Sequence, residues 1–208
     1  MYTISHMAPI SDRERLLRLA RIHQILTTRG VVREGIHRQV LTRLVREGAI
    51  ERIDRSRYRL PCQPITENHG LALAAAAVPR GVVCLISALS FHGIGTQVPH
   101  EIWIALDRRV RRPRLRYPPL RVVRFGGKAL TEGIEAVTVE GQAVEVYCVA
   151  KTVADLFKYR NKVGLDVTLE ALREAWRARR FTMEEIDHFA RICRVEEIMR
   201  PYLEALVV

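Results

Sequence analysis

Residues 36–60 read IHRQVLTRLVREGAIERIDRSRYRL. In the first half of this stretch, apolar residues recur at spacings of three and four, which is typical of one buried helix face. These residues are Ile36, Val40, Leu41, Leu44 and Val45. The opposite face is polar and basic, and it carries Arg38, Gln39, Thr42, Arg43 and Arg46. The pattern predicts an amphipathic helix from Ile36 to Gly48.

The second half of the stretch predicts a basic β-hairpin. Residues 49–53 and 57–61 are short alternating segments, and residues 54–56 between them are typical of a turn. The arginines of this hairpin are Arg55, Arg57 and Arg59. Upstream, Ser11 and Glu14 have the spacing of a capping box, so we expect a helix to begin there and to end at Gly30. Residues 31–35 then leave room for barely one further helical turn.

Helix, turn, helix and hairpin in this order predict a winged helix-turn-helix domain over residues 9–61. A helix with one apolar face and one Arg/Gln/Thr face can enter the major groove, where Arg pairs with guanine and Gln with adenine. The hairpin arginines would contact phosphates and fix the orientation of the domain. We therefore expect double-stranded DNA as a partner. The competing interpretation is a solvated basic face on a small helical bundle.

The charge distribution favours a polyanionic partner. The chain has a formal net charge of +11, and two zones carry it. Residues 1–62 hold 13 Arg and 6 acidic residues, whereas residues 107–128 hold 9 Lys and Arg with Asp107 as the single acid. The second zone predicts a basic loop, which is either a solvated surface or a second nucleic-acid or antitoxin surface. Its arginines are Arg108, Arg109, Arg111, Arg112, Arg114 and Arg116.

A further cationic group surrounds one predicted helix near the C-terminal third of the chain. Its members are Lys151, Lys158, Arg160 and Lys162. Lys151 and Asp155 are four residues apart and could simply form an ion pair. Cations at the end of a helix also complement its dipole. This group therefore indicates binding and structural roles equally.

Residues 62–208 predict a second domain that mixes helices and strands. After a polar segment at residues 61–68, helices are expected over residues 71–77, 83–92, 149–158, 166–179, 182–193 and 195–207. Strands are expected over residues 101–106, 120–125, 134–139 and 142–147, the last two joined by a two-residue turn. Strands in the middle with helices grouped at either end predict an α+β fold with a small sheet flanked by helices. A stripe expected in the core consists of Leu165, Leu169, Leu172 and Trp176.

Three stretches resemble the AbiEi family of antitoxins from abortive-infection, type IV toxin–antitoxin systems. They are residues 44–48 with 57–61, residues 84–105, and residues 149–162 with 164–166, so the resemblance extends over nearly the whole chain from about Ile10. It implies a winged helix that represses its own operon by binding repeats in the promoter. It also implies a C-terminal domain that opposes a nucleotidyltransferase-like toxin, with the toxin or its RNA substrate as a candidate partner. The family usually has a fuller second helix than residues 31–35 allow.

Recognisable enzyme motifs are missing from the sequence. A nucleotidyltransferase needs a Gly-Ser turn together with paired carboxylates, and the sequence has neither a Gly-Ser dipeptide nor a Walker loop. The four cysteines are far apart, and His92 and His100 lack a third ligand, so we expect no metal and no cofactor. We therefore expect no enzymatic activity, although a triad assembled from distant residues stays open.

Membrane association is not expected either. No window offers the unbroken apolar run that a membrane span needs, and the N-terminus lacks the features of a signal peptide. The sequence therefore predicts a cytoplasmic protein. Two rival functions remain: a regulator that senses a small molecule in a pocket between Leu85 and Trp103, and a protein that binds its toxin directly.

Overall fold

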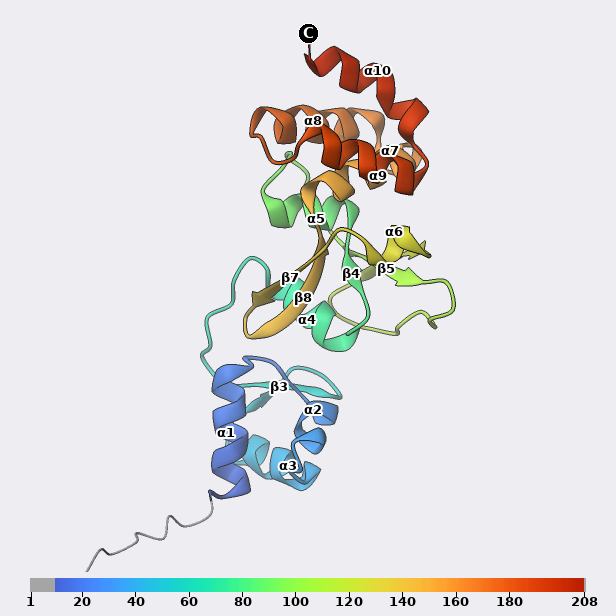
Figure 1. The fold of residues 1–208 in the computed structure, drawn as a ribbon. Coiled ribbons are helices and arrows are strands. Elements are labelled where there is room, and N and C mark those ends of the chain that lie inside the picture. Colours follow the sequence, from blue (N-terminus) through green and yellow to red (C-terminus); the bar gives the residue numbers. More distant parts are fainter. Residues whose placement is uncertain (1–9, 208) are drawn as a thin grey trace, which may run out of the picture. The chain divides into compact units, whose positions relative to one another are not determined.

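A computed structural model describes residues 10–207 and shows two compact units (Figure 1). The first unit comprises the residues up to His69 together with Glu140–Gln142, and the second comprises Gly70–Val139 and the residues from Ala143 onward. Pro9, where the predicted first domain begins, lies outside the described residues. Each unit has an apolar core of its own. Helices and strands are mixed in the chain, so the predicted α+β class is confirmed.

Three helices and a small sheet form the first unit. The helices are α1 (Asp12–Ile22), α2 (Thr28–Arg33) and α3 (Arg38–Arg46). The strands are β1 (Leu26–Thr27), β2 (Glu51–Arg52) and β3 (Arg57–Arg59), which pair antiparallel in the order β1-β3-β2. The core contains Leu16, Ala20, Val31, Leu41 and Leu44, each at most 1% exposed. The predicted helix-turn-helix with its hairpin is therefore present.

The first helix begins as expected but ends early. Ser11 and Glu14 form the predicted capping box, in which the Glu14 N–H donates to the Ser11 hydroxyl oxygen at 3.2 Å. The prediction that this helix extends to Gly30 is wrong, because α1 ends at Ile22. The residues after it leave the helix because Leu26 and Thr27 form strand β1 along β3.

The second helix is also displaced from its predicted place. Thr27 caps α2 by accepting a hydrogen bond from the Gly30 N–H at 3.0 Å. A Cβ atom on Gly30 would lie 2.9 Å from the Thr27 hydroxyl oxygen, so a glycine allows this cap to form. Gly30 therefore lies inside a helix that starts at Thr28, and the supporting helix is longer than residues 31–35 suggest.

A five-stranded sheet organises the second unit. Its strands are β4 (Val82–Val83), β5 (Ile102–Asp107), β6 (Leu120–Phe125), β7 (Ile134–Val139) and β8 (Gln142–Tyr147), in the order β6-β5-β4-β8-β7. Strand β4 pairs antiparallel with β5 and parallel with β8, and β5 pairs parallel with β6. Four strands match the predicted ranges, whereas β4 was expected to open a helix.

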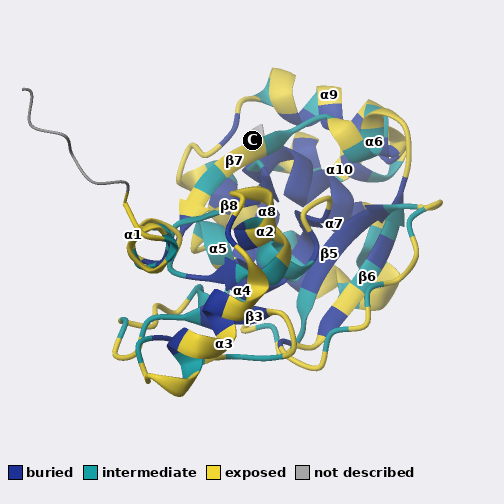
Figure 2. Cartoon of the chain, turned by 90° about the horizontal axis from the view of Figure 1, so that it is seen from below, coloured by how far each residue is buried: buried dark blue, intermediate teal, exposed yellow. Residues whose placement is uncertain are grey.

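Helices pack around this sheet. They are α4 (His69–Ala77), α5 (Leu85–His92), α6 (Lys128–Thr131), α7 (Val149–Val163), α8 (Leu165–Arg177), α9 (Met183–Cys193) and α10 (Glu196–Val207). Helix α7 contacts α5, α8 and α9, and every residue of Val149–Phe157 is buried. Figure 2 shows the buried residues concentrated on β5 and α7. Helix α7 is therefore the central helix of this unit.

The segment expected to hold a ligand pocket is filled by the core. Leu85 is fully buried and Trp103 is 5% exposed. The two segments are held together by hydrogen bonds, since the Cys84 N–H donates to the Trp103 carbonyl at 3.0 Å and the Trp103 N–H donates to the Ser87 hydroxyl oxygen at 2.9 Å. Both residues pack in the main core of the unit. The structure thus gives no support to a ligand site between them.

Helix α8 buries a different face from the one predicted. Of the expected stripe only Leu172 is fully buried, and Leu165 is 40% exposed. The buried residues of the helix are Val167, Thr168, Ala171, Leu172 and Ala175. Small side chains on this face allow α8 to approach α7 closely. As a result, the larger Trp176 lies at the edge of the core.

Candidate nucleic-acid interface

Helix α3 presents a polar face to solvent. Val40, Leu41 and Leu44 point into the core of the first unit and thereby orient the helix. The predicted contact residues of this helix are all exposed on the other side: Arg38, Gln39, Thr42, Arg43 and Arg46. Four of the five, all except Arg38, line one surface hollow of about 570 Å³. The structure therefore brings the predicted base-contacting side chains together.

His37 belongs to the same face and was missed, because the helix was expected to begin at Ile36. His37 is the N-cap of α3, and its Nδ1 accepts a hydrogen bond from the Gln39 N–H at 3.3 Å. With Nδ1 acting as an acceptor, Nε2 carries the ring proton and can donate to a ligand. The signal in the sequence is its place directly before the helix, which is weak because histidine is not a favoured N-cap.

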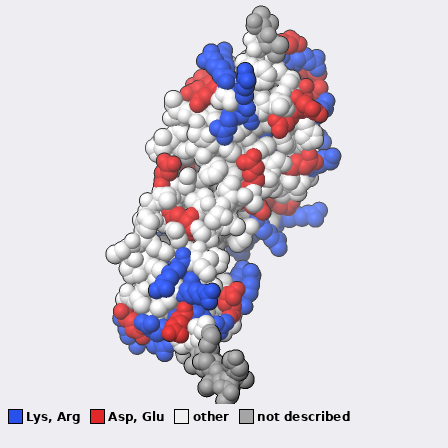
Figure 3. All heavy atoms as spheres, turned by 60° about the vertical axis from the view of Figure 1, so that its left-hand side comes forward, with Lys and Arg blue, Asp and Glu red and all other residues white. Residues whose placement is uncertain are grey.

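Acidic residues lie among the cations of the first unit, as Figure 3 shows. One of them, Glu47, is the C-cap of α3, with its oxygens 3.8 Å from Arg43 Nε and 3.4 Å from Arg13 Nε. The side chains of both pairs are at least 40% exposed. Exposed ion pairs contribute only about 0–1 kcal/mol, so Arg43 can exchange Glu47 for another anion at little cost.

The wing offers fewer cations than the sequence predicted. Arg55 is exposed in the turn, but Arg59 is half-buried and paired with Glu51. Arg52, which was not predicted, is exposed and donates from Nε to the Asp54 carbonyl at 2.7 Å and from a terminal nitrogen to the Arg55 carbonyl at 2.8 Å. The accessible cations of the wing are therefore Arg52 and Arg55.

Arg57 does not lie on the wing surface, contrary to the prediction. Its side chain is only 2% exposed, and its Nε donates to the Asp54 carboxylate at 2.9 Å. The same carboxylate accepts the Ser56 and Arg57 backbone N–H groups at 2.8 and 2.9 Å. Arg57 belongs to the middle strand of the sheet, where its guanidinium fixes the turn instead of meeting a phosphate.

Asp54 is expected to stabilise the wing in a pH-dependent way. Burial raises the pKa of Asp54, but the hydrogen bonds from the Arg57 side chain, Ser56 and the Arg57 backbone, with the Arg57 charge, bring it below its ordinary value of 3.8. A lowered pKa means that the carboxylate stabilises the fold above the unfolded pKa, and that this stability is lost as pH falls through the folded pKa.

We expect Asp54→Asn to lower the free energy of unfolding by about 1–3 kcal/mol at pH 7, because it leaves the buried Arg57 charge without its anion. The difference from wild type should shrink as pH falls through the lowered pKa of Asp54, because the wild-type carboxylate is then protonated as well. Urea unfolding at pH 7 and over an acidic pH series measures this difference. Asp12→Asn is the matched control, at a carboxylate of α1 whose side chain is 44% exposed and pairs with Arg15; an equal effect of both changes would contradict the role of Asp54.

The basic loop at residues 108–116 has a fixed base. Val110 and Leu115 pack against an apolar cluster that includes Ile104 and Leu106. Arg124 of β6 donates to the Asp107 and Val110 carbonyls, both at 2.7 Å. The predicted arginines are all exposed: Arg108, Arg109, Arg111, Arg112, Arg114 and Arg116. Anchored apolar residues thus alternate with outward cations, of which Arg112 also lies 3.5 Å from the Leu120 carbonyl.

The end of α7 adjoins this loop. Lys162 Nζ lies 5.7 Å from the centre of the Tyr159 ring. Burial raises the pKa of Tyr159 to about 12, and Arg108 is near enough for its charge to oppose that rise. Lys158 is exposed as well, whereas Arg160 is half-buried and donates to the Phe157 carbonyl at 2.8 Å. We call the exposed arginines of the loop together with Lys158 and Lys162 the basic surface.

Lys151 is not part of the basic surface, which corrects the prediction. Its ammonium group is fully buried and pairs with Asp155, whose side chain is 1% exposed. The Nζ atom lies 4.3 Å from the ring centre of Tyr147 and 4.8 Å from that of Phe125. The other Asp155 oxygen accepts a hydrogen bond from the Cys193 thiol at 3.1 Å. The structure therefore shows the alternative interpretation of Lys151, an ion pair with Asp155 four residues further on, and places that pair inside the core.

The first unit thus has the features of a winged helix-turn-helix protein, the class in which a polar helix face and an adjoining hairpin contact DNA. Residues 14–61 match the family model described as "Transcriptional regulator, AbiEi antitoxin". The predicted resemblance to this family of antitoxin transcriptional regulators is confirmed for that segment. The resembling stretches at residues 84–105 and 149–166 lie outside the match and stay predictions.

No curated protein matches the chain. Across residues 10–207, no helix is both long enough and apolar enough to cross a membrane. In the same part of the chain, no group of three or more His, Cys, Asp or Glu residues is arranged to hold a metal ion.

Proposed function

We propose that the protein represses its own toxin–antitoxin operon by binding repeats in the promoter. The observation that carries this proposal is the exposed polar face of α3, which lies inside the segment that matches the antitoxin regulator family. Repression requires sequence-specific binding, and Arg, Gln and Thr are the side chains that read base edges in the major groove. Such a repressor acts where the DNA is, which for a bacterial operon is the cytoplasm.

The proposed complex places α3 in the major groove. Arg43 and Arg46 are one turn apart from each other and would each grip a guanine, whereas Gln39 would pair with an adenine. His37 Nε2 would donate to a base or a phosphate at the N-terminal end of the helix. Arg52 and Arg55 of the wing would contact phosphates and fix the register.

A gel-shift titration with the upstream region of the gene tests this proposal. Sequence-specific repression predicts a discrete complex that survives an excess of random duplex competitor at about 150 mM salt. Binding that disappears with the competitor would contradict it, because the net charge alone would then account for the affinity. An upstream duplex with the repeats scrambled is the matched control.

The basic surface is proposed as a second phosphate-contacting surface. Its loop arginines are exposed, fixed at the base and unaccompanied by an acid between residues 108 and 131. Nucleic-acid backbones are the ligands that such cations bind most generally. In the same promoter complex this surface would add affinity without adding sequence preference.

The triple variant Arg109→Gln, Arg111→Gln and Arg114→Gln is expected to flatten the plot of log K against log salt concentration. The slope should change by roughly 0.9 for each phosphate contact removed, and thus by up to about 2.7. Gel shifts over a salt series measure the slope. The control variant changes Arg80, Arg191 and Arg200 to Gln, all exposed in the same unit. Equal slopes for the two variants would show that the loop arginines contact no phosphates and form a solvated surface.

The antitoxin half of the proposal concerns a nucleotidyltransferase-like toxin encoded beside the gene. We propose that the second unit opposes this toxin, either directly or through the RNA on which it acts. Co-expression of the toxin with the full chain should restore growth, and co-purification decides between direct and indirect action. A variant of the second unit that no longer restores growth but still binds promoter DNA would locate the antitoxin activity in the second unit.

A further inference from the structure

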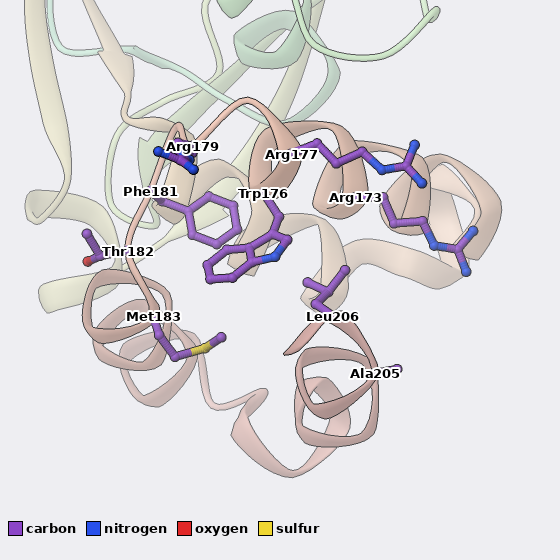
Figure 4. Close-up of a pocket in the computed structure, with 9 residues that line it drawn as sticks. All are labelled: Arg173, Trp176, Arg177, Arg179, Phe181, Thr182, Met183, Ala205 and Leu206. Carbon is purple, nitrogen blue, oxygen red and sulfur yellow. The ribbon is translucent and has the colours of Figure 1, made fainter. Parts of the chain in front are cut away.

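A groove of about 880 Å³ lies between α8, α9 and α10 in the second unit. Its apolar lining consists of Trp176, Phe181, Met183 and Leu206. The rings of Trp176 and Phe181 are 5.9 Å apart, and Figure 4 shows Trp176 and Leu206 facing each other across the open space. Phe181 is buried, whereas the other three are only partly covered. The groove thus leaves apolar surface partly exposed.

Three arginines frame the apolar lining. Arg173 and Arg177 lie one helical turn apart on α8, at one end of the groove, and Arg179 lies at the other end (Figure 4). All three are exposed. Within residues 10–207, none of their side chains forms an ion pair or a hydrogen bond. By contrast, Arg200 of α10 is paired with Glu197. Arg173 and Arg177 also line a neighbouring hollow with Asp166, Glu170 and Glu174, but in the described part of the chain they form no ion pair and can turn to carboxylates of a partner.

A phosphate ligand fits this groove poorly. The N-terminus of α9 is the one helix start that lines it, and its capping box already engages the amide groups of Thr182 and Glu185. Thr182 accepts a hydrogen bond from the Glu185 N–H at 3.2 Å, and the Glu185 carboxylate accepts one from the Thr182 N–H at 2.7 Å. This carboxylate would repel a phosphate. The apolar lining also lacks the polar groups that recognise a nucleobase.

We propose that the groove binds an amphipathic helix of a partner protein, with apolar residues on one face and acidic residues beside them. Apolar anchors at i, i+4 and i+7 would pack on Trp176, Met183 and Leu206, as helices do in apolar grooves. Acidic residues at its two ends would meet Arg173 and Arg177 on one side and Arg179 on the other. Charge complementarity around an apolar centre favours this occupant, and the site is independent of DNA binding by α3.

A designed peptide tests this assignment with the full chain. The probe is a fluorescein-labelled helix of about 18 residues, with leucines on one face and glutamates elsewhere; a second peptide carries lysine in place of each glutamate. Fluorescence anisotropy should show saturable binding of the acidic peptide and binding at least roughly tenfold weaker for the basic one, because the basic one places like charges opposite the arginines. No binding of the acidic peptide, or equal binding of both, would overturn the proposal.

Charge reversal locates the site. The variant Arg173→Glu with Arg177→Glu should weaken binding of the acidic peptide by roughly tenfold or more. The control Arg191→Glu with Arg200→Glu changes the net charge equally, at exposed positions outside the groove, and should leave binding within about twofold of wild type. Equal losses in both variants would show that only overall charge matters and would refute the site.

The same variants separate this proposal from the DNA-binding one. The groove variant and its control should bind promoter DNA about equally well, since each changes the net charge of the second unit by the same amount. Binding of a single-stranded oligonucleotide at the groove, competing with the acidic peptide and lost in the groove variant alone, would overturn the choice of a protein partner. Failure of promoter binding in wild type would leave the groove result unaffected.

Discussion

Replacing Lys151 by methionine is expected to lower the free energy of unfolding of the second unit by about 3–5 kcal/mol. The Lys151 ammonium and the Asp155 carboxylate are both buried in the centre of the core. Removing the cation leaves a buried carboxylate whose desolvation is offset only weakly, by the thiol hydrogen bond from Cys193 and the charge of exposed Lys158. A unit of this size should then melt roughly 6–20 °C lower, and calorimetry of the full chain measures the change.

Two further variants separate loss of the ion pair from loss of a side chain. Lys158→Met removes an exposed lysine from the same helix and should change the melting temperature by less than about 2 °C. The double variant Lys151→Met with Asp155→Leu replaces both charges by apolar groups, so it should recover most of the lost stability. If Lys151→Met is as stable as Lys158→Met, the buried pair does not stabilise the fold.

The double variant Arg43→Ala with Arg46→Ala is expected to lose promoter binding. A bidentate contact between arginine and guanine contributes about 1–3 kcal/mol, so losing two should weaken specific binding by at least about 30-fold. The melting temperature should hardly change, because both side chains are exposed and the Arg43 contact with Glu47 is a surface pair at 3.8 Å. Gel shifts and a thermal melt of the same preparation measure both effects.

Its matched control is Arg18→Ala with Arg21→Ala. These arginines are exposed on α1 of the same unit, and their removal changes the net charge by the same amount. We expect a loss of affinity for random duplex that is similar in the two variants, and a loss of promoter preference only in the α3 variant. Retained promoter preference in the α3 variant would rule out α3 as the reading helix.

Local patterns were sufficient to predict much of the fold. The apolar spacing from Ile36 to Val45 predicted α3, because one stripe of a helix had to be buried. The turn at Glu140 and Gly141 was also predictable, and both residues have positive φ angles of 48° and 70°, as a tight hairpin turn requires. Strand β4 was not predictable, because two valines buried on both faces carry no alternation that distinguishes a strand from a helix.

The candidate site was predictable only where residues are exposed. The five polar residues of α3 share one face because the helical period fixes it. Arg57 and Lys151 were placed on surfaces because each looks like an ordinary cation in sequence. Their burial depends on partners, Asp54 and Asp155, whose positions in space decide whether a charge can be held in the interior. Trp176 shows the converse. It belongs to a regular apolar stripe and was predicted to be buried, but other residues of α8, most of them smaller, are buried in its place.

The burial of Lys151 has a consequence for chemical modification. The chain has four lysines, Lys128, Lys151, Lys158 and Lys162, and all 13 basic residues in positions 1–62 are arginines. Acylation of lysine ε-amino groups, whether by an acetyltransferase or by an amine-reactive dye, can therefore reach only three side chains, all in the second unit. Two of them belong to the basic surface. Such a modification would tune that surface and leave the arginines of α3 with their full charge.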